Sequence, residues 1–160
     1  MNRSTGGTAR ESVVVHVFGK TDVGRTREHN EDALLVVDLT TDDASLQASV
    51  RTHTVGERGT LFMVADGMGG AAAGEIASEM ATTIVLREMR RDWITHPVAD
   101  GESFAKAIAR AAAVSNREIN SFAAAHAEYR GMGTAASIAG LLGDTLYVAQ
   151  VGDSRAYLVR

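Results

Sequence analysis

Acidic side chains stand at the ends of several apolar stretches, next to residues that favour turns. They fall into three clusters: Glu31 with Asp32 in REHNEDA, Asp66 in VADGMGG and Asp153 in VGDSR. A carboxylate beside a glycine with an unobstructed carbonyl, as Asp66 is beside Gly67, offers two oxygen ligands of the kind that hard divalent cations prefer. A single acid of this kind is more often a solvated turn residue. Three clusters at strand ends together favour a cation site.

The segment VADGMGG also allows two other interpretations. It can be a tight turn with Asp66 in solvent, or a dinucleotide-binding loop, because Gly67, Gly69 and Ala72 match G-x-G-x-x-A. In the second case Asp66 would place a negative charge beside the pyrophosphate, and no strand ending in an acid follows at the expected distance. A Walker loop is excluded because its lysine and hydroxyl residue are missing. The cation site is therefore favoured over a nucleotide-binding oxidoreductase.

Composition limits the range of functions. The chain has 160 residues, 45 % hydrophobic and 22 % charged, as expected for one soluble globular domain. Its net charge of -4 opposes general nucleic-acid binding. Without cysteine, a metal must be held by oxygen or imidazole ligands, and we expect a cytoplasmic protein. Residues 1–12 are expected to be a disordered leader because they lack the apolar segment of a signal peptide, and no apolar run reaches membrane-spanning length.

Hydrophobic periodicity predicts strands on both sides of a helical pair. SVVVHVFGK, DALLVVDL and TLFMVAD are predicted strands, the last buried on both faces because its apolar residues do not alternate with polar ones. Residues 39–59 are predicted to be a loop, with at most a weak hairpin of its own. Two helices should follow, the first after the glycine turn and the second capped by Asp100 or Ser103.

The C-terminal part returns to a strand-like pattern. GTAASIAGLL, DTLYVAQV and RAYLVR are predicted strands, and the last two flank the turn GDS as a β-hairpin. The order of three strands, two helices and three strands predicts an α+β fold with antiparallel sheet and grouped helices.

Four of these segments resemble a known family. TDVGRTREHNEDALLV, FMVADGMGGAAAGEIAS, GMGTAASIAGLL and LYVAQVGDSRAYLVR resemble, in this order, the motifs of the metal-dependent serine/threonine protein phosphatases of type 2C (the PPM family), especially its bacterial branch. The resemblance runs from about His16 to Arg160, so residues 13–160 are expected to be the N-terminal two-thirds of such a domain.

The resemblance implies a β-sandwich of two antiparallel sheets flanked by helices (α-β-β-α), incomplete at its C-terminus. It also implies a centre of two manganese or magnesium ions at one end of the sandwich. By matching motifs, Asp66 would bridge both ions. Glu31 and the carbonyl of Gly67 would complete one of them, and Asp32 would hold metal-bound waters.

Three further positions bear on the implied chemistry. Arg27 matches the phosphate-binding arginine of the family, whose planar guanidinium suits two phosphate oxygens at once. Asp153 matches the aspartate that helps to hold a third, weaker metal in bacterial members. Ala71 stands where bacterial members usually carry histidine, which puts general-acid assistance from that position in question.

The function implied by the resemblance is hydrolysis of phosphoserine and phosphothreonine in proteins, by a water that two cations share and deprotonate. No covalent phosphoenzyme is required, in agreement with the absence of cysteine. The substrates would be proteins phosphorylated by a cognate serine/threonine kinase. Because the resemblance covers only part of a family domain, we expect weak or no activity from this chain alone. The alternative is a non-catalytic, phosphatase-like binding or regulatory module.

Overall fold

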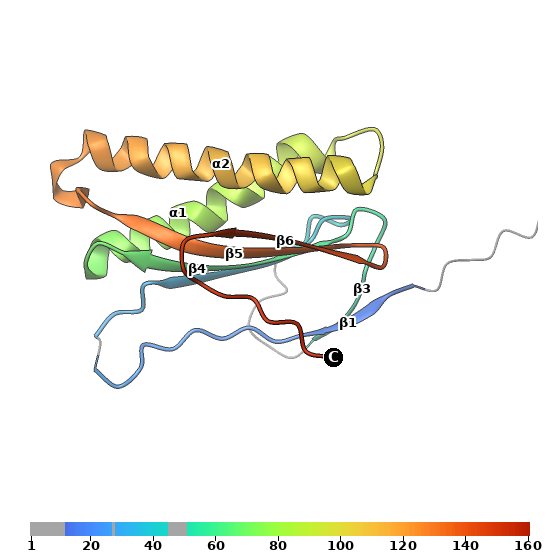
Figure 1. Ribbon diagram of the computed structural model, residues 1–160, viewed down its shortest axis with the longest axis horizontal. Coiled ribbons are helices and arrows are strands. Elements are labelled where there is room, and N and C mark those ends of the chain that lie inside the picture. The colour runs from blue at the N-terminus through green and yellow to red at the C-terminus, as the bar shows by residue number, and fades with distance from the viewer. Residues whose placement is uncertain (1–11, 27, 45–50) are drawn as a thin grey trace, which may run out of the picture.

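The computed structural model describes residues 12–26, 28–44 and 51–160 (Figure 1). In these ranges the strands are β1 (Val14–Val17), β2 (Asp32–Asp38), β3 (Arg51–Thr54), β4 (Thr60–Met68), β5 (Gly133–Leu142) and β6 (Thr145–Val151). The long helices are α1 (Ala71–Met89) and α2 (Gly101–Ala125). A π-helical turn (Arg90–Ile94) follows α1, and a 3-10 turn (Ala127–Tyr129) follows α2.

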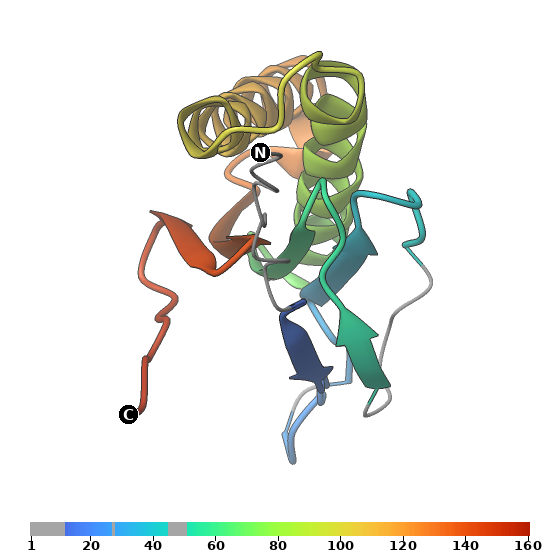
Figure 2. The same ribbon diagram turned by 90° about the vertical axis from the view of Figure 1, so that its right-hand side faces the viewer.

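Two antiparallel sheets and one helical layer make up the fold. The larger sheet has the strand order β2-β4-β5-β6, and the smaller one pairs β1 with β3. Both helices cover one face of the larger sheet, and the smaller sheet lies on the opposite side (Figures 1 and 2). This arrangement confirms the predicted α+β class with antiparallel sheets and grouped helices, although four strands precede the helices and two follow them.

The core lies between the helices and the larger sheet. Alternate residues of β4, namely Leu61, Met63 and Ala65, are buried against the helical layer. Asp100 caps α2 as predicted, since its carboxylate accepts a hydrogen bond of 2.9 Å from the backbone N–H of Ser103. None of the helices in the described ranges combines the length and apolarity needed to cross a bilayer.

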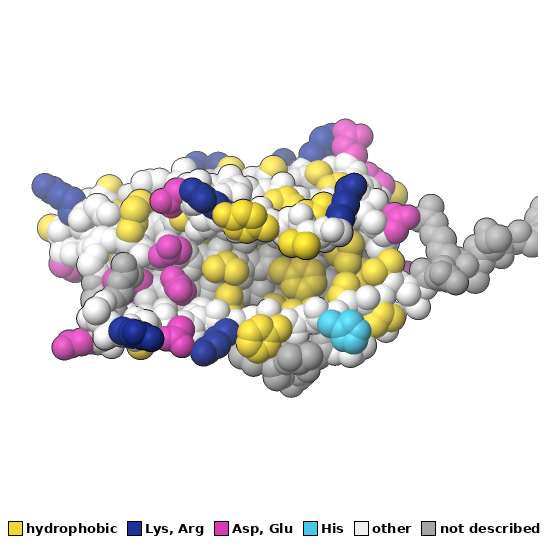
Figure 3. All heavy atoms as spheres, turned by 60° about the horizontal axis from the view of Figure 1, so that its bottom comes forward, with side chains coloured by type: hydrophobic (Ala, Val, Ile, Leu, Met, Phe, Trp, Pro, Cys, Tyr) yellow, Lys and Arg dark blue, Asp and Glu magenta, His cyan; other side chains and the backbone are white. Residues whose placement is uncertain are grey.

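The sheet face that points away from the helices is open. Val64 is 45 % exposed and Met68 61 % exposed, so the prediction that β4 is buried on both faces is wrong. Hydrophobic side chains gather over the middle of this side of the molecule, and acidic side chains gather beside them (Figure 3). The unbroken apolar run of β4 could not indicate this exposure. Such a run shows that both faces of a strand are suited to burial, but it does not show whether another layer of the protein covers each face.

Two other predictions about strands need correction. The predicted loop at 39–59 contains β3, which pairs with β1 and not within its own segment. The C-terminal hairpin joins β5 to β6 around Gly143 and Asp144, while residues 152–160 form no regular structure. The sequence has a glycine–aspartate pair, typical of turns, at residues 143–144 and again at residues 152–153. The strands pair across the first of these turns. The predicted leader lies almost entirely outside the described residues.

Candidate functional site

Strand pairing brings two of the acidic clusters together. β2 and β4 pair in a register that places Asp32 directly opposite Asp66. The carbonyl of Glu31 accepts a hydrogen bond of 3.0 Å from the N–H of Gly67, which extends the pairing by one step. Side chains of directly opposed residues point to the same face, and like charges in such positions destabilise a sheet. The register thus concentrates negative charge at the end of β2 and β4.

Two glycines leave room for the carboxylate of Glu31. A Cβ on Gly74, in the first turn of α1, would lie 2.1 Å from Oε2 of Glu31 and 3.0 Å from the carbonyl carbon of Gly67. A Cβ on Gly67 would lie 2.0 Å from the carbonyl oxygen of Gly74. Neither residue can therefore carry a side chain without displacing its neighbours. The close approach of β4 and α1 creates a cradle that the Glu31 carboxylate fills.

Asn30 and Thr134 support the site, and sequence reasoning missed both. Asn30 Nδ2 donates to Thr21 Oγ1 at 2.6 Å, and Asn30 Oδ1 accepts from the N–H of Asp32 at 3.1 Å. An asparagine directly before two acids is a recognisable signal for such a turn, because its side chain can bond the backbone two residues on. Thr134 Oγ1 lies 2.9 Å from the carbonyl of Asp66 and 2.9 Å from that of Ala135, so its single proton is shared between these two acceptors. The contact with Asp66 joins β5 to β4, so no local signal could have indicated it.

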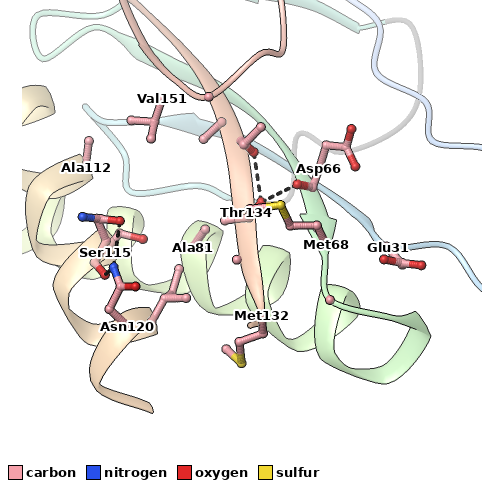
Figure 4. Close-up of a pocket in the computed structure, with 18 of the residues that line it drawn as sticks. Glu31, Asp66, Met68, Ala81, Ala112, Ser115, Asn120, Met132, Thr134 and Val151 are labelled. Carbon is pink, nitrogen blue, oxygen red and sulfur yellow. Dashed lines mark hydrogen bonds between the residues drawn. The ribbon is translucent and has the colours of Figure 1, made fainter. Parts of the chain in front are cut away.

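Four of the predicted metal-site residues line one pocket of about 710 Å³: Glu31, Asp66, Gly67 and Asp153. Figure 4 shows Glu31 and Asp66 at one end of it, on neighbouring segments of chain. Asp32 lines a smaller pocket of about 380 Å³, together with Glu75 and Glu79 of α1. Arg27, the predicted phosphate ligand, lies outside the described residues.

The donors of this pocket fit a hard divalent cation. Two carboxylates, from Glu31 and Asp66, and the carbonyl of Gly67 are oxygen ligands of the kind that Mn²⁺ and Mg²⁺ take. The Asp66 side chain is exposed, and its carboxylate makes no hydrogen bond or ion pair with any residue that the structure describes. Within the described ranges, no group of three or more acidic or histidine side chains is close enough to hold a metal ion.

Comparison with known proteins places these features in a family. A family model described as Protein phosphatase 2C matches residues 32–160. Protein phosphatase PhpP of Streptococcus pneumoniae serotype 2 (strain D39 / NCTC 7466) is 31 % identical over 141 residues, which are 88 % of this chain and 48 % of that protein. The chain therefore spans about half the length of this curated relative.

Solved structures give the same result. The crystal structure of serine/threonine phosphatase Stp1 from Staphylococcus aureus superposes with a TM-score of 0.63 at 27 % identity, covering 96 % of this chain and 51 % of Stp1. The catalytic domain of the serine threonine protein phosphatase PstP, in complex with two manganese ions, gives a TM-score of 0.53 at 25 % identity, covering 90 % of this chain and 48 % of PstP. The motif resemblance is thereby confirmed, and the chain belongs to the protein phosphatase 2C family.

Proposed function

We propose that this chain provides the N-terminal part of a protein serine/threonine phosphatase site that works with Mn²⁺ or Mg²⁺. The observation that carries the proposal is the register of β2 and β4, which sets Asp32 opposite Asp66 beside the cradled carboxylate of Glu31. Like charges held this close by strand pairing are stabilised by a cation between or beside them. Membership of the phosphatase family supplies the reaction that such a site would serve.

Each residue has a defined part in this proposal. Glu31, Asp66 and the carbonyl of Gly67 bind the cations, and Asp32 holds water next to them. Asp153, on the wall of the same pocket, helps to bind a weaker third cation. When bound, the cations supply an activated water and neutralise charge on the phosphoryl group. Arg27 grips two phosphate oxygens of the substrate.

The positions of the binding groups depend on the fold around them. Asn30 fixes the chain directly before Glu31 through its bonds to Thr21 and Asp32. Thr134 holds the backbone of Asp66 from the neighbouring strand. These contacts restrain the backbone next to Glu31 and at Asp66, so less free energy is spent on ordering these segments when a cation binds.

The substrates in this proposal are phosphoserine and phosphothreonine residues placed on proteins by a serine/threonine kinase. We place the activity in the cytoplasm, where kinases that use ATP would supply these substrates. PstP with its two manganese ions supports manganese as the first cation to test.

The experiment compares the chain with Asp66→Asn and Asp144→Asn. Asp144 is a suitable control because it is also an exposed aspartate next to a glycine, but it does not line the pocket. Mn²⁺ binding is measured by calorimetry, and phosphate release from a phosphothreonine peptide is measured in parallel. We expect Asp66→Asn to lose Mn²⁺ binding together with any phosphate release that the parent chain shows, and Asp144→Asn to behave like the parent chain. Binding that survives in Asp66→Asn would refute the proposed site, and peptide binding without hydrolysis would instead favour a phosphatase-like binding module.

A further inference from the structure

The open face of the larger sheet carries an exposed methionine next to the acidic end of the pocket. Residues of β4 alternate between the two faces of the sheet, so Asp66 and Met68 share the face away from the helices, and both line the pocket. The Met68 side chain is 61 % exposed. Two residues along a strand are about 6.6 Å apart, so Met68 is the next side chain after Asp66 on this face. A molecule bound at Asp66 therefore meets Met68 without crossing the sheet.

Met68 stays exposed because the residues around it lack side chains. Gly67 and Gly69 are its neighbours in the chain, and Gly133 is its partner on β5. A Cβ on Gly133 would lie 2.8 Å from Cε of Met68, so the methionine extends across β5 where a side chain of residue 133 would stand. Figure 4 shows it leaning from β4 toward Thr134. Among the described residues, the rim of the pocket on this face is thus backbone with one large apolar side chain.

Val151 is the other exposed large apolar side chain that lines the pocket in the described part of the chain. It pairs with Ala136, which is buried in the core between the sheet and the helices, so Val151 belongs to the opposite face from Asp66. Figure 4 shows Val151 on one side of β5, and Asp66 and Met68 on the other. The two apolar residues therefore differ in one respect that matters: only Met68 is on the face of the predicted cation site.

We propose that Met68 is a specificity-determining residue of the phosphatase site, and that it contacts an apolar side chain two positions away from the phosphorylated residue of an extended substrate. The inference rests on the proposed function and adds a sequence preference to it. Side chains two positions apart in an extended peptide point the same way and are about 6.6 Å apart, which is the spacing of Asp66 and Met68. A phosphate bound through cations at Asp66 brings that neighbour over Met68, while residues one position away point to the other side.

The chemistry of methionine suits this role. Contact with Met68 removes apolar surface of both side chains from water, which favours leucine over serine in the substrate. The unbranched thioether adapts its rotamer to apolar groups of different shapes, as it does at binding surfaces that accept several partners. A thioether is a soft ligand, whereas Mn²⁺ and Mg²⁺ prefer oxygen. Metal binding therefore does not explain an exposed methionine at this place, and contact with a substrate does.

The test uses the full chain with Mn²⁺ and two phosphothreonine peptides of identical composition. One carries leucine two positions before and after the phosphothreonine and serine at the adjacent positions. In the other, the leucines and serines are exchanged. Mn²⁺-dependent binding is measured by fluorescence anisotropy, with phosphate release in parallel. We expect the first peptide to be preferred about fivefold, which is less than full burial of a leucine would give because Met68 covers only one side of it.

Three variants locate the source of the preference. Met68→Ala should reduce it to about one, and Met68→Leu should keep it, because leucine provides an apolar contact at the same place. Val151→Ala is the matched control, since it removes an exposed apolar side chain of the same pocket from the other face, and it should also keep the preference. Damage to the cation site would weaken binding of both peptides alike, so the ratio between them separates specificity from structure.

The outcomes distinguish this inference from the proposed function. Equal binding of the two peptides by the parent chain, or a preference for the second, would overturn the role of Met68 and leave the phosphatase site intact. A preference that persists in Met68→Ala, or that disappears in Val151→Ala, would also overturn it, because the contact would then lie elsewhere. Absence of Mn²⁺-dependent binding and hydrolysis of both peptides by the parent chain would overturn the proposed function, and the role of Met68 with it.

Discussion

Asp32 and Asp66 face each other across the β2–β4 pair, at the end of the larger sheet where Glu31 and Gly67 extend the pairing. Strand pairing therefore holds two carboxylate-bearing residues in a position that is electrostatically unfavourable. The same arrangement concentrates the negative charge that a divalent cation would bind. Removing one of these charges should therefore raise the stability of the metal-free chain and lower its affinity for the metal.

The first prediction concerns Asp66→Asn. Without metal, this change should raise the free energy of unfolding by about 0.2–1 kcal/mol, because it removes one of two like charges on opposed residues. It should also abolish the stabilisation that Mn²⁺ gives to the folded chain by binding it preferentially. Urea unfolding can be followed through Trp93, the single tryptophan, which is fully buried. A loss of stability in EDTA would show that the aspartate stabilises the fold through contacts and not through a cation.

The second prediction concerns the cradle of Glu31. Gly74→Ala should weaken Mn²⁺ binding about tenfold, the usual effect of disturbing a residue that orients a ligand. Helix propensity alone would favour alanine by about 1 kcal/mol, so the loss of affinity is not expected to come from unfolding of α1. Calorimetric titration with Mn²⁺ measures the affinity, and the double variant Gly74→Ala with Glu31→Ala provides the control. If Gly74 acts only through the bond between Glu31 and the cation, the double variant should bind Mn²⁺ no more weakly than Glu31→Ala alone.

The fold class could be predicted from the sequence, and so could the acids of the candidate site as residues at the ends of apolar runs, whereas single strands and contacts could not. These acids stand where apolar runs end, and both the runs and the acids are visible along the chain. The strand β3 was missed because RTHT has no apolar alternation and pairs with β1 across a long segment. The contact between Thr134 and Asp66 was missed because it depends on strand order, which local sequence does not specify.

The open face of β4 shows the same limit. Val64 has the side chain of a buried strand, yet it is nearly half exposed because nothing in the described part of the chain covers it. Whether an apolar residue is buried depends on its neighbours in space. Periodicity identifies the face that can be buried and not the layer that buries it. The positions of Asp32 and Asp66 depend less on such neighbours than the burial of Val64 does, since the pairing of β2 with β4 fixes them whatever covers the sheet.

The third prediction concerns Thr134, which holds Asp66 from β5. Thr134→Val keeps the shape of the side chain but removes the hydroxyl that donates to the Asp66 carbonyl, so the free energy of unfolding should fall by about 0.5–1.5 kcal/mol. Mn²⁺ binding should weaken as well, because the backbone of a ligand becomes less restrained. Thr134→Ser keeps the hydroxyl and is the matched control. Equal behaviour of the valine and serine variants in urea unfolding would show that the hydrogen bond is not what positions Asp66.

The fourth prediction concerns pH and a charge cluster that does not line the pocket. The side chain of Asp92 accepts hydrogen bonds from Arg91 and Arg110, and its carboxyl pKa lies below the ordinary value of 3.8, chiefly because of the bond from Arg91. The unfolded chain therefore takes up this proton first as the pH falls. The contribution of Asp92 to stability is complete above pH 3.8 and is lost as the pH falls through the lower pKa of the folded state.

Asp92→Asn should lower the free energy of unfolding at neutral pH by about 0.5–1 kcal/mol, the upper range for a partly exposed ion pair. It should also reduce the fall in stability as the pH drops below 3.8, because a group that cannot ionise no longer links folding to proton uptake. Urea unfolding at a series of pH values measures both effects, and Asp144→Asn controls for the loss of one negative charge. Since Asp92 does not line the pocket, Mn²⁺ affinity should not change. An acid limb as steep in Asp92→Asn as in the parent chain would mean that other carboxylates carry the linkage.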